Sequence, residues 1–219
     1  MLIKYKWDII KVSNNGKYLL YSNSVADDLS REHIVYSPEK GEIIYTVKTQ
    51  ERINRILADD VNEKLFLIDD STVSAYSFSD SSKPVASVDL ELSFVRNCFI
   101  SDDGKYLFFD KMNNDIDVYD AATLSFVKTL YCSESNLSDT VYIKDTNEYL
   151  FIVANGISFI LNDSLECKKV VYDCVGYDAS GNSYITKYVS LGHIENVSYE
   201  DMIKRADEEL NGFFVGSVS

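Results

Sequence analysis

The stretch Ser101-Asp102-Asp103-Gly104-Lys105-Tyr106-Leu107-Phe108-Phe109-Asp110 decides which fold the sequence predicts. A polar turn with a glycine leads into aromatic and apolar residues, a pattern typical of a hairpin turn followed by a β-strand. Residues 13–22 (SNNGKYLLYS) repeat this pattern, and weaker copies begin at residues 60, 145 and 178. One residue in the turn of each copy marks its position: Gly16, Glu63, Gly104, Asn147 and Gly181. Successive markers are separated by 47, 41, 43 and 34 positions.

A period near 40 residues with four short strands per repeat is typical of a propeller blade. In the third repeat we expect strands at residues 93–100, 105–110, 116–119 and 126–131. In the first repeat we expect them at 7–12, 18–21, 33–36 and 43–47. Four clear repeats and a degenerate fifth therefore predict an all-β fold, a small β-propeller of about five four-stranded antiparallel blades.

The third repeat resembles the WD40-like and YVTN-type propeller repeats. The similarity lies in residues 101–107, in Ile116-Asp117-Val118-Tyr119-Asp120 and in Thr123. The similarity covers most of the chain but is strong only in this repeat. The repeats of this chain lack the Gly-His pair that opens a WD40 repeat, and Tyr119-Asp120 stands where Trp-Asp is typical. The resemblance implies a platform for protein interactions. A stack of antiparallel sheets that does not close into a ring is the alternative.

One helix is expected near the C-terminus, from Ser198 to Asn211. Ser198 can cap its first turn, Tyr199, Ile203 and Leu210 share one face, and Asn211-Gly212 ends it. With two prolines and nine glycines, the sequence offers no flexible linker. We therefore expect residues 1–219 to form a single domain.

The composition favours a cytoplasmic protein. Charges interrupt the N-terminal residues, which lack the apolar stretch of a signal peptide, and no apolar run approaches the ~20 residues that span a bilayer. The four cysteines form no C-x-x-C pair, so we expect buried free thiols and no zinc site. These residues are Cys98, Cys132, Cys167 and Cys174.

Catalytic candidates are few, and we expect no enzyme activity and no cofactor. The two histidines, His33 in a strand and His193 in a loop, lack a neighbouring catalytic motif, so a structural role is favoured. Most of the acidic pairs fit turns, where aspartate bonds its own backbone. These pairs are Asp27-Asp28, Asp59-Asp60, Asp69-Asp70 and Asp102-Asp103. A metal-dependent propeller hydrolase or lactonase is the alternative, although the expected innermost strands offer only Asp8 and Arg96.

Charge points to the kind of partner. With 35 acids against 21 bases, the net charge is −14, which disfavours nucleic acid and anionic membranes as partners. A basic protein is favoured, with solubility alone as the competing explanation for the acidity. The sequence thus predicts a non-catalytic binding module, most concretely an immunity protein or inhibitor that occludes a basic, nuclease-like toxin. A scaffold subunit of a larger complex is a further alternative.

The expected binding face carries the loops between second and third strands and those between successive blades. Because both sets of loops would lie at the same end of the blades, their acidic residues should form one surface. The predicted partner-binding residues are Asp27, Asp28, Asp70, Glu91, Asp115, Glu134 and Asp139. Acids also occur at the other end, at Asp60, Asp103 and Glu148.

Overall fold

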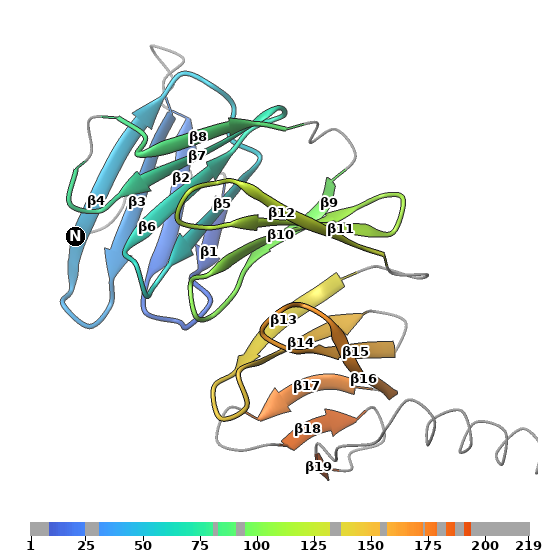
Figure 1. The fold of residues 1–219 in the computed structure, drawn as a ribbon. Helices are drawn as coiled ribbons and strands as arrows, with labels where there is room; N and C mark the ends of the chain where they lie inside the picture. The colour runs from blue at the N-terminus through green and yellow to red at the C-terminus, as the bar shows by residue number, and fades with distance from the viewer. Residues whose placement is uncertain are drawn as a thin grey trace, which may run out of the picture. The chain divides into compact units, whose positions relative to one another are not determined.

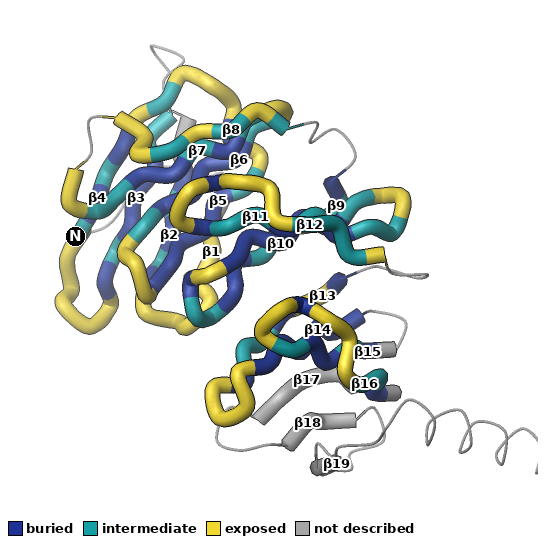
Figure 2. Tube along the Cα trace, in the orientation of Figure 1, coloured by how far each residue is buried: buried dark blue, intermediate teal, exposed yellow. Residues whose placement is uncertain are grey.

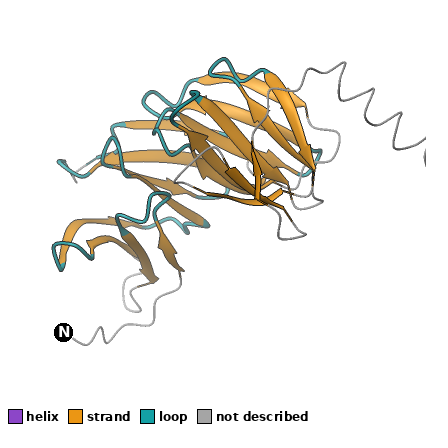
Figure 3. Cartoon of the chain, turned by 90° about the horizontal axis from the view of Figure 1, so that it is seen from below, coloured by secondary structure: helices purple, strands orange, loops and turns teal. Residues whose placement is uncertain are grey.

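The described part of the protein is all-β in its computed structural model (Figure 1). The structure describes residues 9–24, 31–80, 83–90, 95–131, 137–153, 157–172, 174–178, 183–186 and 191–193. These segments contain strands and loops, as Figure 3 shows, and none of them forms a helix that could cross a membrane. The chain divides into two compact units, residues 1–136 and 137–219.

Unit 1 contains three four-stranded antiparallel sheets, each built from one continuous stretch of chain. The first sheet consists of β1 (Ile9–Val12), β2 (Leu19–Ser24), β3 (Arg31–Ser37) and β4 (Glu42–Thr49). The second consists of β5 (Arg55–Asp59), β6 (Lys64–Ile68), β7 (Thr72–Ser77) and β8 (Ala86–Asp89). The third consists of β9 (Val95–Ile100), β10 (Tyr106–Lys111), β11 (Asp115–Asp120) and β12 (Phe126–Tyr131).

Unit 2 contains a fourth four-stranded sheet and a three-stranded sheet. The former consists of β13 (Leu137–Ile143), β14 (Glu148–Val153), β15 (Ile157–Leu161) and β16 (Cys167–Tyr172). The latter consists of β17 (Cys174–Asp178), β18 (Ser183–Thr186) and β19 (Leu191–His193). His193 therefore ends a strand, which corrects its expected place in a loop. The helix expected at 198–211 lies outside the described residues.

The second strand of each four-stranded sheet in the middle of the chain is almost wholly buried (Figure 2). On β6, Phe66 and Ile68 pack into the apolar core shared with the third sheet, whereas Leu65 and Leu67 pack into the core shared with the first. A strand covered on both faces needs apolar residues at every position, not at alternate ones. This explains the continuous apolar runs that follow the repeated turns.

Two of the repeated turns found in the sequence, residues 13–18 and 101–106, form the same hydrogen bonds. In the turn of residues 101–106, Ser101 N donates to Tyr106 O at 2.9 Å and Gly104 N donates to Ser101 O at 2.8 Å. The turn of residues 13–18 forms the equivalent bonds at 3.0 and 2.9 Å. Four of the five marker residues adopt a left-handed conformation, with φ values of 74° at Gly16, 51° at Glu63, 71° at Gly104 and 54° at Asn147. Gly181 lies outside the described residues.

Candidate binding surface

The turns that join the first and second strands of the three sheets in unit 1 are bonded to one another. We call these turns, residues 13–18, 59–64 and 101–106, the hub. Asp60 links the first two, because its Oδ2 accepts hydrogen bonds from Ser13 Oγ at 2.9 Å and from Asn15 N at 3.0 Å. Asp60 is itself buried. A carboxylate that accepts several hydrogen bonds joins the turns more strongly than neutral contacts would.

The third turn of the hub contacts both of the others. Asn62 Nδ2 donates to Gly104 O at 3.1 Å, and Asn15 Nδ2 donates to Asp102 O at 3.2 Å. Asp59 holds Asn62 in place, since its Oδ2 accepts from Asn62 Nδ2 at 2.7 Å and its Oδ1 from Asn62 N at 3.0 Å. The first turn therefore contacts the third directly as well as the second.

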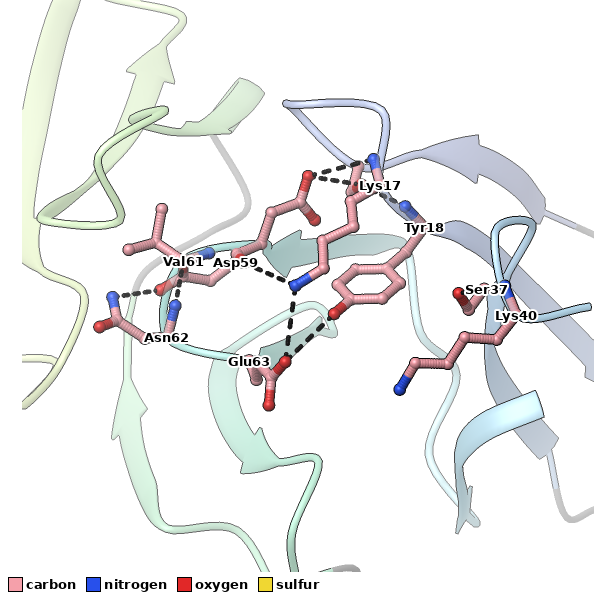
Figure 4. A network of polar contacts seen from close by, with 10 residues as sticks. Lys17, Tyr18, Ser37, Lys40, Asp59, Val61, Asn62 and Glu63 are labelled. Atoms are coloured by element: carbon pink, nitrogen blue, oxygen red, sulfur yellow. Dashed lines mark hydrogen bonds and ion pairs between the residues drawn. The ribbon is translucent and has the colours of Figure 1, made fainter. Parts of the chain in front are cut away.

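The outer side of the hub carries an exposed ion pair. Lys17 Nζ lies 3.5 Å from Glu63 Oε1, and the hydroxyl of Tyr18 donates to the same oxygen at 3.4 Å (Figure 4). Both charged side chains are largely exposed, so we expect this pair to contribute little to stability. The bonds that the buried Asp60 accepts from Ser13 and Asn15 are the stronger link between the first two turns.

Because the first-to-second-strand turns of unit 1 lie together in the hub, the other loops of its sheets can be assigned to one end of the sheets or the other. Each antiparallel hairpin reverses the chain, so the turns between second and third strands lie at the end of each sheet away from the hub. The connections between successive sheets lie there too. We call this the distal end. Asp70, in the turn between β6 and β7, and Asp115, at the start of β11, both belong to it.

Asp70 and Asp115 are accessible carboxylates. Asp70 is exposed and accepts a hydrogen bond from the side-chain amide of Asn54. Asp115 is half-buried, and its Oδ2 accepts from Asn113 Nδ2 at 2.6 Å. Asp115 begins a strand, a small correction to its predicted place in a loop, because the β11–β12 ladder extends to the pair Asp115 and Tyr131.

Asp139 was also expected in a loop, and this is wrong. It lies within β13 of unit 2, where it pairs with Ile152. Desolvation of the carboxyl raises the pKa of Asp139 above its usual value. The hydrogen bond that its Oδ1 accepts from Thr140 N at 2.8 Å lowers the pKa by a smaller amount. The prediction failed because an isolated acid in a short strand resembles a loop residue. Four predicted residues lie outside the described part of the chain: Asp27, Asp28, Glu91 and Glu134.

The acids expected on the other face are engaged within the protein. In the hub, Asp60 is buried and Asp103 Oδ1 accepts from Lys105 N at 3.1 Å. In unit 2, Glu148 is buried, pairs with Lys168, and accepts from Thr146 Oγ1 at 2.8 Å. Their charges are therefore used to hold turns and strands in place.

The first strands of unit 1 carry one cation each, Lys11, Arg55 and Arg96. Arg55, at the start of β5, is half-buried, and its Nη2 donates to Val95 O at 3.0 Å and to Arg96 O at 2.6 Å. Arg96 Nη1 lies 3.7 Å from Oδ2 of the fully buried Asp110. Lys11 of β1 is exposed. The recurrence of one basic residue in each first strand was the signal available in the sequence.

His33 and the cysteines have the environments of structural groups, with one exception. His33 is fully buried, and its two ring nitrogens lie 2.9 Å from Ser22 Oγ and from Thr49 Oγ1. Cys98 is a buried free thiol, as expected. Cys167 is exposed, which corrects the expectation that it is buried, because it begins the outer strand β16.

No group of three or more histidine, cysteine, aspartate or glutamate side chains that could hold a metal ion occurs within the part of the chain that the structure describes. No known protein-family model matches the chain, and no curated protein matches it. The arrangement of charges in unit 1 is therefore the main guide to function.

Proposed function

We propose that this protein is a non-catalytic binding module that recognises a basic protein through the distal end of unit 1. The observation that carries the proposal is the contrast between the two ends. At the hub, Asp59 and Asp60 are buried and bonded, whereas Asp70 at the distal end is exposed and makes no ion pair with a described residue. Exposed carboxylates on a strongly acidic protein attract a basic partner and accelerate association.

In this proposal the five sheets are the blades of a small propeller. Each described sheet is an antiparallel meander whose strands follow one another in sequence, which is the blade pattern. The first strands of neighbouring sheets are in contact in unit 1, with β5 next to both β1 and β9. A propeller would present the distal ends of its blades as one continuous surface.

The narrower proposal is that the module inhibits its partner by covering a basic active site. A nuclease-like toxin binds phosphates with lysines and arginines, and carboxylates can occupy the same positions. Such an inhibitor needs no catalytic group of its own. Its on-rate would fall as salt is added, because surface charges are screened at distances beyond the Debye length.

The test compares the wild type with a variant in which both described distal carboxylates are reversed, Asp70→Lys with Asp115→Lys. Each immobilised protein is exposed to lysate of the source cells, and bound proteins are quantified by mass spectrometry. We expect basic proteins retained by the wild type to be lost from the double variant. The affinity of the leading protein is then measured at two salt concentrations.

Glu39→Lys with Glu42→Lys is the matched control, because both residues are exposed and lie at the β3–β4 turn, at the hub end of the first sheet. This double reversal changes the net charge by the same amount as the double distal substitution. The control should retain the basic proteins. If all of the variants retain the same proteins as the wild type, the distal end is not the binding surface.

A further inference from the structure

The first turn of the hub contains the pair Asn15-Gly16, one of three Asn-Gly pairs in the sequence. The other two, at residues 155–156 and 211–212, lie outside the described residues. When glycine follows asparagine, the backbone nitrogen of the glycine can easily reach the side-chain amide carbon, because glycine has no side chain to hinder the approach. Asn15 and Gly16 are both exposed. The pair is therefore a candidate site for deamidation.

Deamidation of this pair needs water and no other reactant. The Gly16 nitrogen loses its proton to hydroxide and attacks Cγ of Asn15. The bond between Cγ and Nδ2 then breaks, and Nδ2 leaves as ammonia, so that a succinimide ring remains. Water opens the ring at one of its carbonyl carbons, which gives either aspartate or isoaspartate at position 15. No oxidation or reduction takes place.

In the closed hub, hydrogen bonds hold the groups that take part in this reaction. Gly16 N donates to Ser13 O at 2.9 Å, so the N–H of the attacking nitrogen is directed at that carbonyl. Asn15 Nδ2, the leaving group, donates to Asp102 O at 3.2 Å. Asn15 N donates to Asp60 Oδ2 at 3.0 Å, which fixes the backbone of the same residue. Ring closure therefore requires that the first turn leave the other two.

Opening of the first turn exposes little apolar surface. Residues 14–17 are all exposed, and the apolar core between the first and second sheets begins at Tyr18. A segment with few buried apolar contacts opens at a lower free energy than the whole protein unfolds. The rate of deamidation at Asn15 should therefore report how often this turn opens, and not how often the protein unfolds.

The third turn of the hub shows where a carboxylate at position 15 would bind. The two turns form the same backbone bonds, and Asp103 has the place in the third that Asn15 has in the first. Asp103 Oδ1 accepts from Lys105 N at 3.1 Å, within its own turn. The equivalent donor in the first turn, Lys17 N, donates to Asp60 Oδ2 at 3.4 Å. An aspartate at position 15 should therefore compete with Asp60 for Lys17 N.

The same conversion removes a bond between turns. A carboxylate has no N–H to donate, so the bond from Asn15 to Asp102 O would be lost and two acceptors would face each other. The new negative charge would also lie close to the carboxylate of Asp60, which accepts from the backbone nitrogen of the same residue. The first turn would keep its own backbone bonds, as the third does, and lose links to both neighbours.

We propose that Asn15 is a site of spontaneous deamidation that the closed hub protects, and that its conversion to aspartate detaches the first turn from the other two. Because the ammonia is lost to the solvent, the original bonds are not restored when the hub closes again. Isoaspartate, which adds a methylene group to the main chain, would also prevent the turn itself from forming. The proposal does not depend on the binding function proposed above, since it concerns the hub alone.

The test follows deamidation of the full chain at mildly alkaline pH, in buffer and in urea. Trypsin cleavage after Lys11 and Lys17 gives a peptide of residues 12–17, and fragment masses assign the change to Asn15. We expect Asn15 to react at least about tenfold more slowly in buffer than in urea, the factor that an opening free energy of ~1.4 kcal/mol gives. Equal rates would overturn the proposal, and so would the absence of a reaction in urea.

Two variants distinguish opening of the hub from unfolding of the protein. Asp60→Asn removes the charged acceptor that joins the first two turns, so it should accelerate deamidation at Asn15. Leu124→Ala is the control, because Leu124 packs into the core between the second and third sheets and leaves the bonds of the hub in place. Both are incubated at the same interval below their own Tm. The rate should be higher in Asp60→Asn, and equal rates would show that only global unfolding exposes the site.

Asn15→Asp reproduces the product directly. We expect it to lower Tm by about 2–4 °C, the shift that loss of one hydrogen bond gives for a chain of this size. Gln50→Glu is the matched control, because Gln50 is exposed, follows the end of β4 and undergoes the same change from amide to carboxylate. Its Tm should stay close to that of the wild type. If Asn15→Asp and Gln50→Glu have the same Tm, conversion of Asn15 does not detach the turn.

Discussion

Two glycines with the same backbone conformation differ sharply in their surroundings. Gly16 and Gly104 have φ values of 74° and 71°, which L residues adopt only with strain. A Cβ on Gly16 would meet nothing within 4 Å. A Cβ on Gly104 would lie 2.5 Å from Asn62 Nδ2 and 2.6 Å from Asp59 Oδ1. Gly104 is therefore needed for close approach within the hub as well as for its dihedral angle.

This difference predicts unequal costs for the same substitution. Gly16→Ala should lower the free energy of unfolding by about 1 kcal/mol, the cost of a left-handed alanine. Gly104→Ala should lower it by about 2–4 kcal/mol, because it adds steric overlap with Asn62 and Asp59. Urea unfolding of the two variants measures the difference. Equal losses would show that the hub is looser than its hydrogen bonds indicate.

His33 should make stability depend on pH. Desolvation by burial, with the nearby charge of Arg31, lowers the pKa of His33 from 6.5 to about 4 in the folded protein. The unfolded chain therefore binds a proton below pH 6.5 that the folded protein does not. Stability should be unaffected above pH 6.5 and fall toward pH 4, by up to ~3 kcal/mol from this group.

Chemical unfolding between pH 7 and pH 5 tests this expectation. The wild type should lose stability with a slope approaching ~1.4 kcal/mol per pH unit below pH 6.5. His33→Gln keeps a polar group beside Ser22 and Thr49 but cannot titrate, so its slope over the same range should be flatter. Parallel slopes would show that His33 is not the group responsible.

At the scale of single elements, the turns between third and fourth strands repeat as closely as the hub turns do. Gly41, Leu124 and Leu165 occupy matching positions, with φ values of 69°, 57° and 60°. Leu124 and Leu165 are buried, and Leu124 packs into the core between the second and third sheets. Burial of the side chain therefore offsets backbone strain where glycine would be the usual residue.

Leu124 allows the two contributions to be separated. Leu124→Gly relieves the strain but removes a buried side chain, so it should lower the free energy of unfolding by about 1–3 kcal/mol. Leu124→Ala removes nearly as much buried surface and keeps the strain, so it should be the less stable of the two variants. A glycine variant as stable as the wild type would show that the leucine is tolerated rather than required.

These turns also show what the sequence could and could not predict. The hub turns were found because Gly16 and Gly104 are recognisable turn residues followed by the same Lys-Tyr-Leu. The left-handed leucines were not found, because leucine is no turn signal. Strand ends were missed where polar residues continue a ladder, as where Ser24 pairs with Arg31 beyond the predicted strands.

For the whole molecule, the pattern of four strands per repeat predicted four of the sheets, and the fading of the fifth repeat matches a sheet with three described strands. The candidate site could be predicted less well. Asp70 lies where the pattern placed it, but Asp139 does not, and the pattern gave no role to the cations of β1 and β5. Pairing within a sheet follows from neighbouring residues, whereas the meeting of side chains from different sheets depends on contacts between distant parts of the chain.

The hub has a consequence for how the protein is made. The first sheet can form once residue 49 has left the ribosome, but Asn15 donates to the carbonyl of Asp102 at 3.2 Å. That partner is synthesised on the order of several seconds later, at ordinary rates of translation. During this interval the apolar core and the hydrogen bonds accepted by Asp60 keep the first two sheets together. The last bonds of the hub then join the start of the nascent chain to a segment made long after it.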